Sequence, residues 1–98
     1  QVLLAGIDTI VASTPFTEQM RLGATGKEVT KLQKYLTADP ELYPEGLVTG
    51  NFLQLTRQAV IRFQEKYAAD VLAPLGLLQG TGYVGASTRA KLNSLLSF

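Results

Sequence analysis

Cysteine and histidine are both absent from this sequence of 98 residues. Without cysteine the chain can form no disulfide, thiol nucleophile or Cys-type zinc site. Without histidine it lacks the commonest metal ligand, the usual general base and any Ser-His-Asp triad. The carboxylates Asp39, Glu41 and Glu45 share one loop around Pro40, where their spacing indicates turn chemistry and matches no EF-hand. We therefore predict a protein that is not an enzyme and that uses no metal or cofactor.

The chain also lacks an excess of one charge and a long apolar run. Nine Lys and Arg against eight Asp and Glu give a net charge of +1, and the basic residues are scattered, so no nucleic-acid partner is expected. No stretch approaches the roughly 18–20 apolar residues of a membrane span. The apolar opening Gln1–Ser13 contains Asp8 and no basic segment, so we expect no signal peptide. Because the first residue is Gln, we interpret the chain as a piece of a longer protein.

What the chain does contain is enough apolar residues for one core. With 46% hydrophobic and 17% charged residues, it is too apolar to be disordered and long enough for a single domain. Three segments space their apolar residues at three- and four-residue intervals, as a helix with one buried face does. These residues are Val29, Leu32, Tyr35 and Leu36, then Ala59, Val60, Phe63, Tyr67 and Val71, and finally Leu92, Leu95 and Leu96.

Capping residues and prolines indicate where these helices begin and end. The expected caps are Thr25 with Glu28 in a capping box for the first helix, Thr56 for the second, and Ser87 or Thr88 for the third. The expected stops are Asp39-Pro40 and Pro74, because proline disfavours a helical residue before it. Residues 41–49 and 75–82 are then loops.

The predicted fold class is all-α, a compact three-helix bundle with long inter-helix loops and an additional apolar N-terminal segment. We divide the chain into an N-terminal arm, residues 1–19, and a three-helix domain, residues 20–98. The apolar residues of the arm fit a helical face, but Gly6 weakens that assignment, so a strand or an extended arm stays open. We expect the arm to pack on the bundle or on another chain, which would allow self-association. Its apolar residues are Leu3, Leu4, Ile7, Ile10 and Val11.

An internal repeat connects the two loops. Gly50–Arg57 (GNFLQLTR) aligns with Gly82–Arg89 (GYVGASTR) at a fixed offset of 32 residues, Gly82 against Gly50. Each copy places a glycine at a turn, an apolar residue two positions later, and Thr-Arg at the start of a helix. We expect the two apolar residues, Phe52 and Val84, to be buried and to anchor their loops over the core.

Taken together, these motifs resemble the peptidoglycan-binding domain family, which is found on bacterial cell-wall hydrolases and envelope proteins. The resemblance runs from about Met20 to Leu96. Its four pieces are RLGxxGxxVxxLQxxL from Arg21, GxF from Gly50, TxxAVxxFQ from Thr56, and GxVGxxT from Gly82 followed by Leu92. The resemblance implies a compact three-helix fold and recognition of cell-wall glycopeptide, in the cell envelope or outside the cell, as an accessory to a catalytic domain elsewhere in the parent chain.

The expected ligand site combines three parts: the loop of the first repeat copy (residues 50–56, the first-copy loop), the helix start at residues 56–57, and the loop of residues 77–83. Arg57 stands in a first helical turn, where the dipole does not favour a cation, and this indicates an anionic partner. Tyr83 is a candidate exposed aromatic residue, whereas Gln33 and Gln64 are expected to hydrogen-bond loop backbone. The candidate ligand-binding residues are Asn51, Leu53, Gln54, Leu55, Thr56, Arg57, Gln79 and Tyr83.

A protein–protein interaction module on the same scaffold, natural or engineered, is the alternative function. It would use residues 51–58 as its contact loop. Several leucines lie in the predicted loops, outside the buried faces of the helices, and they favour this alternative. Leucines in a loop either pack beneath the loop or form an interaction patch. These leucines are Leu53 and Leu55 in one loop and Leu75, Leu77 and Leu78 in the other.

Overall fold

The computed structural model describes residues 14–98, so the predictions for Leu3–Val11 lie outside the described residues. The described chain is helical, and the predicted all-α fold is confirmed. Its helices are α2 (Lys27–Thr37), α3 (Gln54–Lys66), the short α4 (Ala68–Val71), the 3-10 turn η2 (Ala73–Leu75) and α5 (Ala86–Leu95). Between residues 14 and 98 the only β-type pairings are two isolated bridges, Met20 with Val84 and Thr25 with Asn51.

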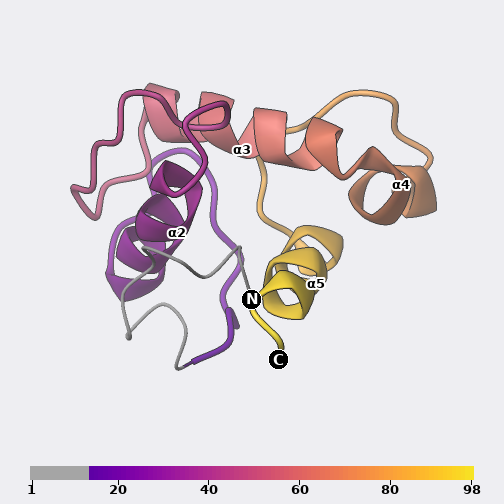
Figure 1. The fold of residues 1–98 in the computed structure, drawn as a ribbon, viewed down its shortest axis with the longest axis horizontal. Coiled ribbons are helices and arrows are strands. Elements are labelled where there is room, and N and C mark those ends of the chain that lie inside the picture. The colour runs from indigo at the N-terminus through magenta and orange to yellow at the C-terminus, as the bar shows by residue number, and fades with distance from the viewer. Residues whose placement is uncertain (1–13) are drawn as a thin grey trace.

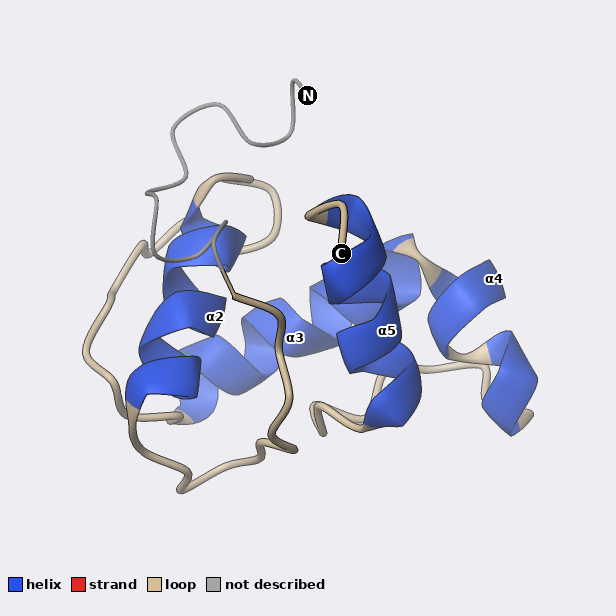
Figure 2. Ribbon diagram, turned by 90° about the horizontal axis from the view of Figure 1, so that it is seen from below, coloured by secondary structure: helices blue, strands red, loops and turns tan. Residues whose placement is uncertain are grey.

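Helix α3 forms the back of the molecule, and α2 and α5 lie on the same side of it. Figure 1 shows α3 and α4 running across the top of the view, with α2 below one end and α5 below the other. Figure 2, seen from below, shows α3 crossing behind both of these helices. The three longer helices are therefore the three that the apolar spacing predicts.

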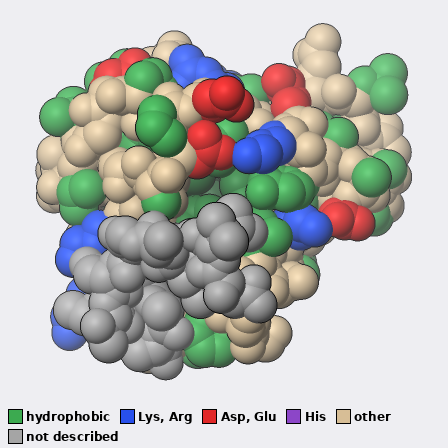
Figure 3. Space-filling model, viewed as in Figure 1, with side chains coloured by type: hydrophobic (Ala, Val, Ile, Leu, Met, Phe, Trp, Pro, Cys, Tyr) green, Lys and Arg blue, Asp and Glu red, His purple; other side chains and the backbone are tan. Residues whose placement is uncertain are grey.

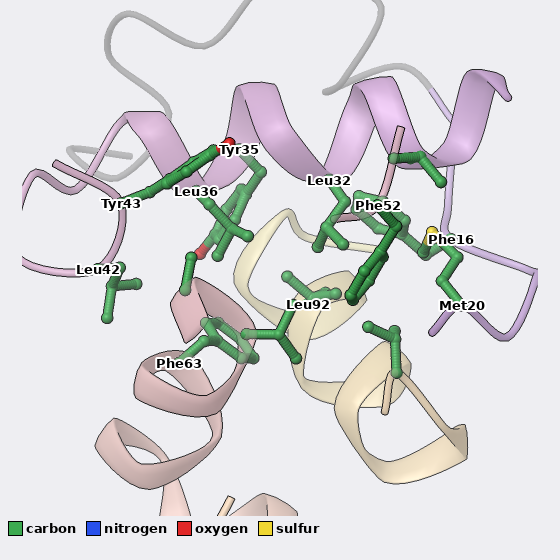
Figure 4. Close-up of a cluster of buried hydrophobic side chains, with 14 of the residues drawn as sticks. Phe16, Met20, Leu32, Tyr35, Leu36, Leu42, Tyr43, Phe52, Phe63 and Leu92 are labelled. Carbon is green, nitrogen blue, oxygen red and sulfur yellow. The ribbon is translucent and has the colours of Figure 1, made fainter. Parts of the chain in front are cut away.

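The core lies where the three longer helices face one another. Leu32 of α2, Phe63 of α3 and Leu92 of α5 point toward a common centre (Figure 4), and each is at most 1% exposed. The two apolar repeat residues, Phe52 and Val84, are both fully buried, which confirms the prediction that each anchors its loop in the core. Burial of such large apolar side chains is the main source of stability for a domain of this size.

The start of α2 differs from its predicted capping box. Gly26 is the N-cap residue, with a positive φ of 122°, and no side chain caps the helix. Thr25 instead pairs with Asn51 in an isolated bridge. The Glu28 carboxylate accepts hydrogen bonds from the Thr17 amide at 3.1 Å and the Glu18 amide at 3.0 Å. The predicted capping box is therefore wrong. Gly26 takes the N-cap position, and Glu28 bonds to residues 17 and 18, which precede the segment that leads into the helix and are invisible to a local pattern.

Thr56 and Thr88 are also not helix caps. Helix α3 has Leu53 as its N-cap residue and α5 has Gly85, so each threonine is the third residue inside its helix. Both threonine side chains face the core and are 2% exposed. The hydroxyl of Ser87, the other predicted cap, donates to the Val71 carbonyl at 2.9 Å. The threonine before the helical apolar pattern predicts a cap. In this fold that threonine lies inside the first turn and its hydroxyl group is buried.

The second helix ends earlier than Pro74. Helix α3 stops at Lys66, since Tyr67 leaves the helical region with φ −111° and ψ 38°. A four-residue helix then follows, and Pro74 lies inside the 3-10 turn after it. Proline is tolerated in the first turn of such a segment because its missing N–H would have no intrahelical partner there. This break lets Val71 and Leu72 turn back into the interior, where each is 1% exposed.

The described end of the N-terminal arm packs on the bundle. Phe16 is 3% exposed, and its amide donates to the Asn93 side chain at 2.7 Å while Asn93 donates back to its carbonyl at 3.0 Å. The Lys31 ammonium lies 4.8 Å from the Phe16 ring centroid and donates to Thr14 Oγ1 at 2.7 Å. Residues 14–19 are thus tied to both α2 and α5, while the boundary drawn at residue 20 stays a prediction.

Candidate functional site

The first-copy loop is held by one buried glutamine of α2. The side chain of Gln33 is 1% exposed. Its Oε1 atom accepts from the amides of Thr49 and Gly50, each at 2.9 Å. Its Nε2 atom donates to the Asn51 carbonyl and to Thr56 Oγ1, each at 3.0 Å. One amide group therefore satisfies loop backbone that would otherwise be left without partners, as the sequence predicts.

Gln64 of α3 holds the second-copy loop in the same way. Its Oε1 atom accepts from the amides of Thr81 at 2.8 Å and Gly82 at 3.0 Å. Its Nε2 atom donates to the Tyr83 carbonyl at 2.7 Å and to Thr88 Oγ1 at 3.1 Å. The repeat is thus a helix–loop–helix unit used twice, and the two units overlap because α3 closes the first and opens the second.

A segment before α2 joins the two loops, and we call it the strap, residues 19–26. At one end Met20 and Val84 exchange backbone hydrogen bonds of 3.2 and 2.8 Å. At the other end the Gly23 amide donates to the Phe52 carbonyl at 2.8 Å. The Phe52 amide in turn donates to the Ala24 carbonyl at 2.9 Å. The strap therefore crosses from one repeat loop to the other and fixes their spacing.

A solvent-open cleft lies between the strap, the second-copy loop and the start of α3. One part has a volume of about 460 Å³ and is lined by Arg21, Leu22, Arg57, Thr81, Gly82 and Tyr83. An adjoining part, also about 460 Å³, is lined by Gln19, Met20, Arg21, Leu22, Gly23, Ala24 and Tyr83. Neither lining contains an acidic residue, so the charges that these residues bring to the cleft are the two guanidinium groups.

Gly82 positions Arg57 at the cleft. Gly82 has a φ of +80°, and a Cβ atom built on it would lie 2.7 Å from Arg57 Cγ. The stem of Arg57 therefore lies directly against the loop backbone, and it can do so only because that position has no side chain. Arg89, at the matching position of the second copy, donates instead to the Val84 carbonyl at 3.1 Å. The guanidinium group of Arg57 makes no hydrogen bond or ion pair to another of the described residues.

Tyr83 forms the aromatic wall of the cleft. Its side chain is 39% exposed. Its hydroxyl group donates to Gln19 Oε1, so the ring is tied to the strap. A Cβ atom built on Gly85 would lie 3.0 Å from Tyr83 Cε2, which shows how closely the ring lies over that glycine. The ring is therefore held in place while it keeps an exposed face.

The structure brings together only two of the predicted ligand-binding residues, Arg57 and Tyr83. Thr56 is buried and its hydroxyl bonds to Gln33, so it faces away from solvent. The others are exposed but line none of the cleft: Asn51, Leu53, Gln54, Leu55 and Gln79. Thr81 and Gly82 lie in the predicted loop of residues 77–83, whereas the cleft residues that sequence reasoning missed all come from the strap: Gln19, Met20, Arg21, Leu22, Gly23 and Ala24. Arg21 and Leu22 did appear in the family motif, which was the available signal.

The surface outside the cleft mixes both signs of charge. Figure 3 shows Lys and Arg side chains interspersed with Asp and Glu side chains on one face. The hydrogen bond from Lys66 to Asp39, at 2.7 Å, lowers the pKa of the Asp39 carboxyl and raises the pKa of Lys66. Lys91 pairs with Asp70 at 2.7 Å. Within residues 14–98, no group of acidic side chains is placed to hold a metal ion.

Loop leucines form a second exposed feature. Leu78 is 95% exposed and Leu75 is 60% exposed. Hydrophobic side chains protrude at the end of the molecule formed by α4 and the loop after it (Figure 3). A small cavity of about 260 Å³ lies beneath, lined in part by Leu72, Leu77 and Ala86.

Among the described helices, none has the length and apolar character needed to cross a membrane.

A family model matches part of the chain. Residues 25–71 match the model of the family described as "Putative peptidoglycan binding domain". This stretch contains α2, the first repeat loop, α3 and α4, and thus the whole first helix–loop–helix unit with its Gln33 amide. No curated protein and no solved structure matched the chain. The match over residues 25–71 is to the peptidoglycan-binding domain family, the family that the motifs predicted.

Proposed function

We propose that this chain is a non-catalytic module that binds bacterial peptidoglycan through the cleft between the strap and the second-copy loop. The family match supports the class of ligand. The observation that supports the location is the convergence of Arg21, Arg57 and the exposed ring of Tyr83 on one cleft without an acidic residue. Under this proposal the protein works in the cell envelope or outside the cell, where peptidoglycan is found.

The cleft offers complementary contacts to both parts of a glycopeptide. A guanidinium group can bind a stem-peptide carboxylate through two parallel hydrogen bonds. The exposed face of Tyr83 offers apolar contact to a sugar ring or to the peptide stem. The Thr81 side chain adds a hydroxyl to the same lining. None of these groups is a nucleophile with a neighbouring base, so the proposed function is recognition without chemistry.

Sedimentation with purified sacculi tests the proposal. We expect the wild-type protein to pellet with sacculi at micromolar concentration, and Tyr83→Ala with Arg57→Gln to stay in the supernatant. Lys27→Gln is the matched control, because Lys27 is exposed at the start of α2 and lines neither part of the cleft. Absence of wild-type protein from the pellet would refute wall binding. Pelleting of the double variant would refute the location.

The alternative, a protein-interaction module that uses residues 51–58, has less support. Leu53 is 60% exposed and Leu55 37% exposed, so both leucines are available for contact. However, the family match points to peptidoglycan as the ligand. Light scattering at rising concentration would detect self-association through this loop.

A further inference from the structure

We infer that the cleft selects stem peptides with free carboxylates and discriminates against stems whose carboxylates are amidated. This inference rests on the proposed function and deepens it, because it names the chemical group that the cleft reads. Amidation keeps the size and shape of the group almost unchanged and removes its negative charge. A cleft that recognises shape alone would not distinguish the two forms, whereas a cleft that recognises charge would.

The first observation that supports this inference is the pairing of the basic residues. Most of the cations are already engaged within the protein. Lys66 and Lys91 have aspartate partners, Lys31 bonds to Thr14 and Pro15, Arg62 bonds to the Leu42 carbonyl, Arg89 bonds to the Val84 carbonyl, and Lys34 also has a partner. Arg21, Lys27 and Arg57 are the basic residues that remain, and Arg21 and Arg57 line the same part of the cleft.

The second observation is the contrast between the two copies of the repeat. Arg57 and Arg89 occupy matching positions, the fourth residue of α3 and of α5. Arg89 turns back onto its own loop and donates to the Val84 carbonyl. Arg57 lies instead across Gly82 of the other copy's loop, which directs it into the cleft. The second arginine thus has a structural partner, and the first is left available to a ligand.

The chemistry of the two guanidinium groups gives the direction of selectivity. A carboxylate offers two acceptor oxygens to the paired N–H donors of arginine. A carboxamide offers one oxygen, and its NH₂ group would meet the arginine donors with donors of its own. No acidic residue lines the cleft to accept from that NH₂ group. Amidation therefore removes the charge attraction and leaves a mismatched donor.

The test compares two soluble muropeptides, a disaccharide–tetrapeptide with free carboxyl groups and its amidated counterpart, by calorimetric titration. In low salt we expect the free acid to bind about 10- to 150-fold more tightly, which is the effect of one hydrogen bond to a charged group. Arg21→Gln and Arg57→Gln should each reduce this ratio toward one. Arg57→Lys should keep part of it, because the charge remains and the paired donors are lost.

The controls separate this inference from the proposed function. Lys27→Gln removes the same charge outside the cleft and should keep the ratio. Because Arg21 is exposed, Arg21→Gln should leave the fold intact, which circular dichroism would verify. If wild-type protein pellets with sacculi but binds both muropeptides equally, the carboxylate inference is overturned and wall binding stands. If it binds neither sacculi nor muropeptide, both are overturned.

Discussion

Replacing Gln64 with leucine should destabilise the domain strongly, although leucine is similar in size and more apolar. The Gln64 side chain is 2% exposed and holds four partners in the second-copy loop and α5. Leucine fills much of the space but offers no donor or acceptor. The Thr81 amide belongs to an exposed residue and can bond to water instead. Gly82 and Thr88 are buried, so their polar groups lose their partner without a replacement.

The expected magnitude follows from those orphaned groups. Each buried polar group that loses its partner costs about 1–3 kcal/mol, and the apolar surface of leucine offsets part of this. We expect a net loss of about 2–5 kcal/mol. A domain of this length has about 5–15 kcal/mol of stability in total, so the variant would be marginally folded.

Urea denaturation followed by circular dichroism measures this loss. Gln58→Leu is the matched control, since Gln58 lies on the exposed side of the same helix. We expect the control to stay within about 0.5 kcal/mol of wild type. Gln33→Leu should cost as much as Gln64→Leu, because Gln33 makes the equivalent set of bonds. A loss below about 1 kcal/mol for Gln64→Leu would refute the reasoning.

Three further predictions concern other features. Gly82→Ala should cost about 1–2 kcal/mol through its φ of +80° and should also weaken muropeptide binding by displacing Arg57; unchanged melting and unchanged titration would contradict it. Asp39→Asn should cost less than about 1 kcal/mol at neutral pH, since the pair with Lys66 is exposed. Because the hydrogen bond from Lys66 lowers the pKa of Asp39 below 3.8, this stabilisation is present above that pH and disappears as the pH falls through the lower folded value; a stability difference from wild type that does not shrink as the pH falls below 3.8 would argue against it. Phe52→Ala should cost about 3–5 kcal/mol in the same urea assay, since it empties a fully buried position, and a loss under about 1 kcal/mol would mean that the loop is not anchored there.

The helices were predictable because their evidence is local and periodic. The apolar faces of α2, α3 and α5 follow from residue spacing, and the buried residues agree with it. The helix starts were not predictable in the same way. A threonine followed by a helix is as compatible with a cap as with a buried hydroxyl inside the first turn. Only the partners Gln33 and Gln64, each far away in sequence, decide between these for Thr56 and Thr88.

The candidate site was predictable only for residues within the repeat. Arg57 was predicted because its position is unfavourable for a cation, and Tyr83 because it is an aromatic residue outside the buried position of its repeat copy. Arg21 and Leu22 come from the strap, which reaches the cleft through the pairing of Met20 with Val84. No periodicity predicts a single isolated bridge between such distant segments. The exposed residues Asn51, Leu53, Gln54 and Leu55 were predicted because they belong to the first-copy loop, and they line no part of the cleft.

The sharing of α3 by both units has a consequence for truncation and for hydrogen exchange. A fragment that ended with the family match at residue 71 would keep the partners of Gln33. It would lose every hydrogen-bond partner of the Gln64 side chain, because these partners lie at residues 81–88. The Gln64 amide would then have no partner in an incomplete core. Opening of either loop likewise disturbs α3, while α2 and α5 each depend on one loop only. The amides in the middle of α3 should therefore exchange only when the whole domain opens, and the ends of α2 and α5 should exchange sooner.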